Sequence, residues 1–460
     1  MIYTDLLRYM GNRLKTGVRG TVFFSLLALH NPKLNHMKAG SHWTIWQKIA
    51  FRFFFLFLGL SSIVAWHLII YFIKGIFSNS RDYDFMNVYS FLGKALHWFD
   101  RIFFHVGYDP KVHMPLPADN HYGVVFYLAV FMIAVIGTVA WSILDRNRPN
   151  YKKLSYWFNL CLRYMLALVL FGYGMDKLVP IQMPYPDVSE LLTPLGEENR
   201  FSVLWDFMGV SPGFQMFTGT CELIGSLLLT SRRTALAGYM VLLIVLINVV
   251  AFNIFYNIPV KLFSSLLLAS LLYLLIPYMY RLVQLFFYKK PVFLSDTLYR
   301  FQSNVKTYTL KAILIIVPFV AFLIFTILNV RKYKRNLANS KNEKLYEVLV
   351  FIAKDTLPPL LTDTLRWRRL LFANANDAIV CNMRDEKTWY KCDRDTLKKT
   401  FTLQDGVDSS AKYLFHYDFP QADQMNVTGK WKGNDVSILM KSVPIDSMLI
   451  KKEKLVLMQD

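Results

Sequence analysis

Cysteine is scarce in this sequence, with four residues in 460, and no two of them form a CxxC pair. That count excludes a disulfide-rich secreted scaffold, and the missing CxxC pair argues against direct thiol–disulfide catalysis. Charged residues are also sparse, at 18% of the chain, compared with about a quarter in soluble domains. GxGxxG and Walker sequences are absent as well, so a soluble nucleotide-binding domain is not expected.

Acidic residues are few relative to basic ones, 32 against 52, which gives a formal net charge of +20. The excess lies in residues 1–340, with 33 basic and 15 acidic side chains, whereas residues 341–460 hold 19 and 17. Residues 1–340 are also the apolar part of the chain. A basic excess beside long apolar runs is typical of the cytoplasmic face of a membrane protein. We therefore expect a lipid bilayer as the partner, and no nucleic acid.

Seven apolar runs of about 20 residues, the length of a membrane-spanning helix, occur before residue 331. They are Ile49–Ile73, Val124–Leu144, Tyr156–Leu178, Phe214–Thr230, Thr234–Phe255, Val260–Tyr280 and Thr309–Val330. The fourth is the least apolar, because it contains Glu222. The sequence therefore predicts an α-helical membrane bundle of about seven transmembrane helices.

The charge of the loops predicts the orientation, because cytoplasmic loops are enriched in Lys and Arg. Segments 1–46, 145–155, 231–233 and 281–307 hold 17 basic and 3 acidic residues, whereas segments 77–121, 179–212 and 256–261 hold 6 and 10. We expect the N-terminus in the cytoplasm of a bacterial inner membrane and, after seven crossings, the C-terminal domain in the periplasm. Four basic residues at 331–335, directly after the seventh predicted span, argue against this orientation. Long C-terminal domains, however, cross the membrane largely regardless of local charge.

Three regions follow along the chain. Residues 1–46 are expected to form a cytoplasmic segment with a surface-lying helix around Val22–Leu29, residues 47–335 the bundle, and residues 340–460 an extracytoplasmic domain. From Leu345 onward, short runs between polar turns are typical of strands. They are Tyr346–Ile352, Thr364–Phe372, Ala378–Met383, Thr388–Cys392, Lys399–Leu403, Lys412–Tyr417, Met425–Trp431, Val436–Lys441 and Met448–Met458. Eight or nine short strands favour a small antiparallel β barrel or sandwich.

Cys381 and Cys392 lie symmetrically about the polar segment Asp385–Thr388. A two-residue turn at Glu386-Lys387 would place them opposite each other on neighbouring strands, where an oxidising periplasm allows a disulfide. The alternative is two unpaired thiols, and the separation of the two Cα atoms decides between these readings.

Glu222 lies inside the fourth predicted span, where an ionised side chain costs about 2.5–3.5 kcal/mol and needs a partner or a purpose. Lys153 precedes Arg163 by ten residues, and Arg232 follows Glu222 by ten. If both outlying basic residues mark the inner interface, Arg163 and Glu222 both lie at a depth of about 15 Å. Arg163 is therefore the predicted partner of Glu222, in a pair that either fixes helix packing or serves a function.

A second polar group gathers at the predicted outer ends of spans three to six. It comprises Tyr173, Asp176, Lys177, Gln182, Gln215, Asn253, Asn257 and Lys261. These side chains either line an outward-opening cavity that offers donors to a quinone head group or a small anion, or form an interfacial layer satisfied by lipid head groups and water. The histidines of the 77–121 region recur every eight residues, which does not fit one helix face, so no metal site is expected.

Five stretches of the chain resemble the DoxX-like membrane proteins of Bacteroidetes. They are WSILDRNRPNYKKLSYW (141–157), FGYGMDKLVPIQMPYP (171–186), LWDFMGVSPGFQMFTGTCELIGSLLLTSRRTALAG (204–238), NIPVKLFSS (257–265) and DTLPPLLTDTLRWRRLLF (355–372). The last looks like the extracytoplasmic domain that follows the bundle in that group. The resemblance implies a four-helix DoxX-like core at about residues 154–285, distantly similar to the membrane region of vitamin K-dependent carboxylase-like (HTTM) proteins.

Three functional hypotheses follow. Some members of the DoxX superfamily are subunits of thiosulfate:quinone oxidoreductases, so the resemblance implies a quinone- or sulfur-redox-associated membrane subunit, with quinone as the candidate cofactor. The β domain shows no recognised catalytic constellation, which favours a non-catalytic envelope protein that presents a periplasmic binding domain to a periplasmic or membrane partner. A small-anion transporter is the third hypothesis, with Arg163 and Glu222 as its gate at mid-depth.

Overall fold

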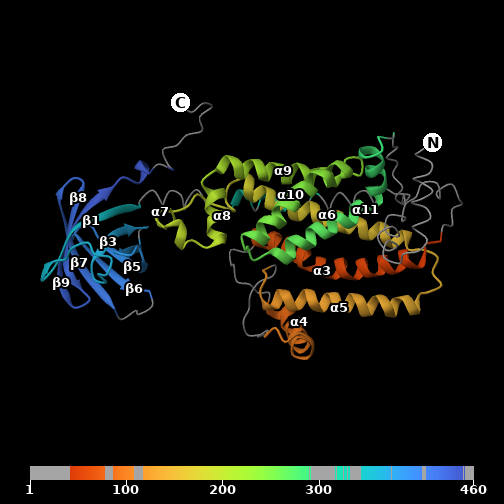
Figure 1. Ribbon diagram of the computed structural model, residues 1–460, viewed down its shortest axis with the longest axis horizontal. Helices are drawn as coiled ribbons and strands as arrows, with labels where there is room; N and C mark the ends of the chain where they lie inside the picture. The colour runs from red at the N-terminus through yellow and green to blue at the C-terminus, as the bar shows by residue number, and fades with distance from the viewer. Residues whose placement is uncertain are drawn as a thin grey trace, which may run out of the picture. The chain divides into compact units, whose positions relative to one another are not determined.

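The structure, a computed structural model, describes residues 42–77, 86–107, 118–289, 343–373, 376–406 and 411–448, with residues 291 and 450 and several positions between 316 and 331. The chain divides into two compact units (Figure 1). The helical unit comprises the chain up to Gln182 together with Met216–Ile327, and the barrel unit comprises Met183–Gln215 and the chain from Leu328 onward. The predicted surface-lying helix around Val22–Leu29 is outside the described residues.

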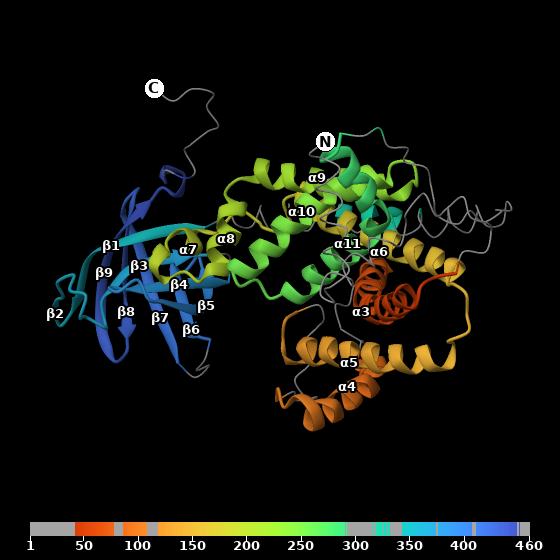
Figure 2. The ribbon, with the colours of Figure 1, turned by 45° about the vertical axis from the view of Figure 1, so that its right-hand side comes forward.

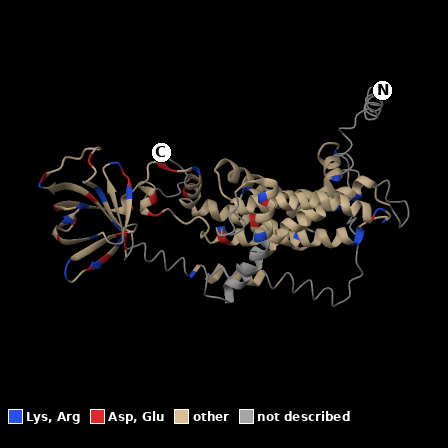
Figure 3. Ribbon diagram, turned by 90° about the horizontal axis from the view of Figure 1, so that it is seen from below, with Lys and Arg blue, Asp and Glu red and all other residues tan. Residues whose placement is uncertain are grey.

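Long apolar helices make up most of the helical unit. Its elements are α3 (Ile45–Phe77), α4 (Met86–Phe99), the π-helical turn η3 (Asp100–Phe104), α5 (His121–Leu144), α6 (Lys152–Leu178), α9 (Pro212–Thr230), α10 (Ala235–Phe255) and α11 (Lys261–Phe286). Five of them, α3, α5, α6, α10 and α11, are long and apolar enough to span a membrane. Figure 3 shows that these helices carry few charged residues along their length, whereas the barrel carries both signs. These are the features of a membrane protein.

Five of the seven predicted spans are confirmed as helices of sufficient length and apolar character. The fourth, Phe214–Thr230, corresponds to α9, a helix of 19 residues that is not apolar enough to count among the five. Most of the seventh, Thr309–Val330, is outside the described residues, although it overlaps the apolar helix Phe319–Leu328. The structure therefore confirms five of the seven predicted spans and leaves the fourth and the seventh as predictions.

The helical unit packs α3 against α5 and α6, and packs α11 against α10 and α6 (Figure 2). Aromatic rings fill the space near the start of α3, where Phe51 stacks on Tyr151 at 5.3 Å and meets Trp43 edge-on at 5.4 Å. Arg52 is 3% exposed, and its guanidinium donates to the Tyr151 hydroxyl at 2.7 Å and to the Asp145 carbonyl at 2.8 Å. The buried guanidinium is therefore satisfied by hydrogen bonds to neighbouring oxygen atoms, as a charged group inside a membrane protein requires.

Eight antiparallel strands close into a barrel in the other unit (Figure 1). In order around the barrel they are β1 (Lys344–Ala353), β3 (Trp367–Phe372), β4 (Asp377–Asn382), β5 (Lys387–Asp395), β6 (Thr400–Asp405), β7 (Lys412–Gln421), β8 (Gln424–Trp431) and β9 (Asn434–Val443), with the two-residue β2 (Asp355–Thr356) beside β1. The ring closes where β1 pairs with β9, from Leu345 opposite Val443 to Ala353 opposite Val436. Of the two predicted architectures, the barrel is the one that forms.

Large side chains fill the interior of the barrel. Phe351, Trp367, Phe401 and Phe415 are each at most 1% exposed, and Trp367 meets Trp431 edge-on at 5.0 Å. Each aromatic side chain of this kind removes 150–250 Å² from water, at about 25 cal/mol per Å² of apolar surface. The interior of this barrel is therefore a packed core, as small barrels allow.

The segment Met183–Gln215 packs on the outside of the barrel, although the sequence indicates only an outer loop there. It contains α7 (Val188–Leu191), η4 (Leu195–Glu197) and α8 (Arg200–Gly209). Val188 is 1% exposed in a cluster with side chains of β1, β3 and β4, namely Leu345, Leu371, Ile379 and Cys381. The Lys387 ammonium donates to the Ser189 carbonyl and to the Thr193 hydroxyl. The segment thus covers one outer face of the sheet.

Of the two readings for Cys381 and Cys392, the structure has the unpaired thiols, because both cysteines are free. Asp385 adopts the left-handed φ of +63°, and its N–H donates to the Asn382 carbonyl, so the turn comes earlier than Glu386-Lys387. This register places Cys381 opposite Lys387, so these two side chains share one face of the sheet. Cys392 follows Lys387 by five residues, an odd number, so its side chain points to the opposite face. Cys392 accordingly lies in the barrel core, and Cys381 lies under α7.

Candidate functional site

Helices α6 and α9 cross at close range, and two glycines make this possible. A Cβ atom on Gly219 would lie 2.7 Å from the Gly174 carbonyl oxygen and 2.8 Å from the Cβ of Lys177. A Cβ atom on Gly174 would lie 3.0 Å from the Gly219 carbonyl oxygen. Small residues at the crossings of membrane helices allow backbones to approach this closely. The crossing brings together Lys177 and Glu222, which follow the two glycines by three residues each.

Lys177 and Glu222 form a buried ion pair. The Lys177 Nζ donates to Glu222 Oε1 at 2.8 Å and to Oε2 at 2.9 Å. Lys177 is 8% exposed and Glu222 is 2% exposed. The ring of Tyr173, one turn before Lys177, has its centroid 5.6 Å from the same Nζ. A pair of this kind is stable only while both charges are present, because either one alone is unpaired in a medium that solvates charge poorly.

The predicted pairing of Glu222 with Arg163 is wrong, because the carboxylate is bound by Lys177. The prediction placed Lys153 and Arg232 at the same level. In the structure the Tyr164 hydroxyl lies 3.5 Å from the Thr230 carbonyl oxygen, so the end of α9 lies beside the first half of α6 and not beside its first residues. Glu222 therefore lies further toward the end of α6 than the count indicates, and it meets Lys177. The gate formed by Arg163 and Glu222 does not exist in this arrangement.

The residues of the predicted outer polar group make separate contacts in different parts of the structure. Tyr173 and Lys177 lie together beside Glu222. Gln215 is fully buried, and its side-chain amide accepts from the Met183 N–H at 3.2 Å and donates to the Met183 carbonyl at 2.7 Å. Those two bonds close the base of the Met183–Gln215 segment, which leaves this amide little capacity for a ligand.

Four further residues of the predicted outer group lie after α6 or near the α10–α11 turn. The Lys261 Nζ is 3.8 Å from a carboxylate oxygen of Asp119. Asn253 is 6% exposed, and Asn257 adopts a left-handed φ of +55°. The Gln182 Oε1 is buried and has no hydrogen-bond partner among the described residues. That these residues line one outward cavity for a quinone or an anion stays a prediction.

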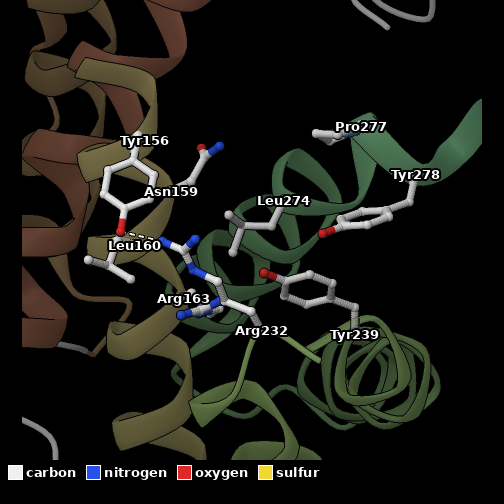
Figure 4. A pocket seen from close by; sticks show the side chains of 9 residues that line it. All are labelled: Tyr156, Asn159, Leu160, Arg163, Arg232, Tyr239, Leu274, Pro277 and Tyr278. Carbon is white, nitrogen blue, oxygen red and sulfur yellow. Dashed lines mark hydrogen bonds between the residues drawn. The ribbon is translucent and has the colours of Figure 1, made fainter. Parts of the chain in front are cut away.

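A small polar pocket lies between α6, the α9–α10 turn, α10 and α11 (Figure 4). Its lining residues are Tyr156, Asn159, Leu160, Arg163, Arg232, Tyr239, Leu274, Pro277 and Tyr278, and its volume is about 30 Å³. The Arg232 guanidinium donates to the Tyr156 hydroxyl across the pocket. The sequence indicates Arg163 but not this pocket, because Tyr239, Tyr278 and Arg232 reach it from two other helices and a turn.

Apolar helices of membrane-spanning length and a closed antiparallel barrel define the class of this chain, a membrane protein with a β-barrel unit. No family model and no solved structure matches it. A stretch of 114 residues, 25% of the chain, is 32% identical to the uncharacterized protein YwoB of Bacillus subtilis (strain 168) and covers 71% of that protein. The chain therefore belongs to the same family as YwoB. The name of that relative states no activity, so the function is argued from the structure.

Proposed function

We propose that this chain is an inner-membrane protein of the DoxX-like class, whose helical unit anchors an extracytoplasmic barrel unit in the bacterial envelope. The five apolar helices support the membrane location. Basic residues in the α5–α6 connection and in the α9–α10 turn, such as Arg148 and Arg233, support a cytoplasmic location for that end of the bundle. By the same count the barrel lies in the periplasm, where the outside of the barrel is the surface available to a protein partner.

The main support for this proposal is that two separate segments of the chain make up the barrel unit. It contains Met183–Gln215, which connects α6 to α9, in addition to the C-terminal strands. The chain therefore passes between the two units three times, whereas an appended domain needs a single connection. Helices α6 and α9, which hold both ends of this segment, are joined to each other by the glycine crossing and by the Lys177–Glu222 pair. This connectivity is what an anchor requires.

Cysteine labelling tests the proposed topology. Lys398 in the barrel unit and Arg148 after α5 have side chains that are 81% and 56% exposed. In cells with a permeabilised outer membrane, a membrane-impermeant maleimide is expected to modify Lys398→Cys and to modify Arg148→Cys only after lysis of the inner membrane. The wild-type chain supplies the background from its native thiols. Labelling of Arg148→Cys in intact cells, with Lys398→Cys protected, would overturn the orientation.

A redox-associated role is the second candidate, and the arrangement of Tyr173, Lys177 and Glu222 favours it. Quinone reduction takes up protons together with electrons, so a quinone site needs groups that exchange protons. A lysine–carboxylate pair beside a phenol supplies such groups within a membrane helix bundle. The proposed DoxX-like class, some of whose members are subunits of thiosulfate:quinone oxidoreductases, points to the same chemistry.

Quinone bound to the purified chain distinguishes the second candidate from a simple anchor. After purification in a mild detergent, mass spectrometry of the lipid extract is expected to detect quinone in the wild-type chain and much less in Glu222→Gln, which keeps the size of the side chain but removes its charge. Lys153→Gln, at the start of α6, is the matched control and is expected to retain the quinone. A wild-type chain that contains no quinone and shows no redox turnover would eliminate this candidate.

A further inference from the structure

The pocket between α6, α10 and α11 holds positive charge that the described residues do not neutralise. Arg163 is 6% exposed, and its Nε has no hydrogen-bond partner among the described residues. In the described part of the chain neither Arg163 nor Arg232 has a carboxylate oxygen within 4.0 Å, and Glu222 is bound by Lys177. A buried guanidinium without a counter-ion is unfavourable, so an anion that enters the pocket gains stabilisation.

The other polar groups of the pocket are suited to binding oxygen atoms. Figure 4 shows the hydroxyl groups of Tyr239 and Tyr278 pointing toward the pocket from α10 and α11, opposite the two guanidinium groups. Asn159, one turn before Arg163 on α6, adds an amide that can present either its oxygen or its NH₂ group. Guanidinium forks match the spacing of phosphate oxygens, and hydroxyl donors complete such a site.

The pocket lies near one end of the bundle, where lipid head groups meet a membrane protein. Tyr156 is in the second turn of α6, and Arg232 is in the turn between α9 and α10. Side chains lean toward the N-terminus of their helix, so Arg163 extends from the middle of α6 back toward this end. Basic pockets between transmembrane helices on the cytoplasmic side bind the head groups of anionic lipids.

The size of the pocket limits the ligand to one small charged group. A volume of about 30 Å³ corresponds to about two water-sized spheres, so the rest of a larger ligand stays outside. We propose that Arg163 and Arg232 bind a phosphate group at the inner end of the bundle. An anionic phospholipid and free inorganic phosphate both present this group, and the test separates the two sources.

Melting of the purified full chain, together with native mass spectrometry, tests the site. Phosphatidylglycerol in mixed micelles is expected to bind and to raise the melting temperature. Phosphatidylcholine is expected to leave it unchanged, because its choline ammonium neutralises the charge of its phosphate. Arg163→Gln and Arg232→Gln are each expected to weaken this binding about tenfold or more, because each removes a charge-assisted contact to phosphate. Arg232 is half-buried and nearer the bundle end, so Arg232→Gln keeps the test decisive if Arg163→Gln does not fold.

Arg233→Gln is the matched control, because Arg233 is the exposed neighbour of Arg232 and does not line the pocket. It is expected to bind phosphatidylglycerol as the wild-type chain does. Competition by inorganic phosphate would identify the free anion as an alternative source, and its failure would assign the site to the lipid. Equal stabilisation by both lipids, equal losses in Arg232→Gln and Arg233→Gln, or no binding of either phosphate source would overturn the proposal.

Discussion

Replacing Glu222 with alanine is expected to destabilise the helical unit by about 3–5 kcal/mol, because it leaves Lys177 as a buried ammonium without a partner. Lys177 is 8% exposed, and its Nζ lies 2.8 Å from the Glu222 carboxylate. Water therefore cannot replace the lost carboxylate without opening the crossing of α6 and α9. Unfolding of the purified full chain in SDS, followed by the helical circular-dichroism signal, measures the loss.

A double-mutant cycle shows whether the loss belongs to the pair. Lys177→Met combined with Glu222→Leu removes both charges and keeps apolar volume, so we expect stability near that of the wild type and strongly non-additive single effects. Lys261→Met is the control, because Lys261 is 32% exposed and 3.8 Å from Asp119, and it is expected to lose less than about 1 kcal/mol. Additive single effects would contradict the pairing of Lys177 with Glu222.

The sequence predicts membrane helices because a span requires about 20 apolar residues whatever its neighbours are. Helix α10 accordingly begins at Ala235, within one residue of its predicted start. The partner of Glu222 is not predictable in the same way, because it depends on the level at which two helices cross. The two glycines set that level, and a one-dimensional count from Lys153 and Arg232 cannot include them.

In the barrel, too, features set by neighbouring residues are predictable from the sequence, whereas contacts between distant residues are not. Alternating side chains predict eight or nine strands because the pleat is a local property, whereas the pairing of Cys381 depends on the turn at Asp385. The docking of α7 is harder still to predict, since a four-residue helix has no periodic pattern that marks Val188 as buried. The arginine pocket has the same difficulty, because its polar groups converge only after three helices have packed.

Replacing Val188 with aspartate is expected to release the Met183–Gln215 segment from the barrel and to expose Cys381. Val188 is 1% exposed in an apolar cluster, so a carboxylate at this position has to leave the cluster to reach water. Cys381 is 3% exposed, and burial raises the pKa of its thiol. Maleimide modification of Cys381 near neutral pH, measured by peptide mass spectrometry, is expected to accelerate about tenfold or more, because the thiolate is the reactive form.

Two controls separate release of the segment from unfolding of the barrel. Cys392 faces the barrel core, where burial raises the pKa of its thiol to about 11, and it is expected to stay unmodified while the barrel is folded. Leu195→Asp places the same carboxylate in the same segment at a position that is 75% exposed, and it is expected to leave Cys381 protected. Modification of both cysteines in Val188→Asp would indicate unfolding instead.

Lys387→Ala is expected to loosen the Met183–Gln215 segment from the barrel less than Val188→Asp does. It removes the hydrogen bonds to Ser189 and Thr193 but leaves the apolar cluster in place. The pH dependence of Cys381 modification then shows what has changed. Exposure to water lowers the pKa of the Cys381 thiol toward its ordinary value, whereas loss of the Lys387 ammonium, which holds this pKa down, acts in the opposite direction. The rate should therefore rise at lower pH in Val188→Asp than in the wild-type chain, and this shift should be smaller in Lys387→Ala. A Cys381 that stays protected in a folded Val188→Asp variant would mean that the segment does not hold the barrel, and the threefold connection proposed for the anchor would lose its physical basis.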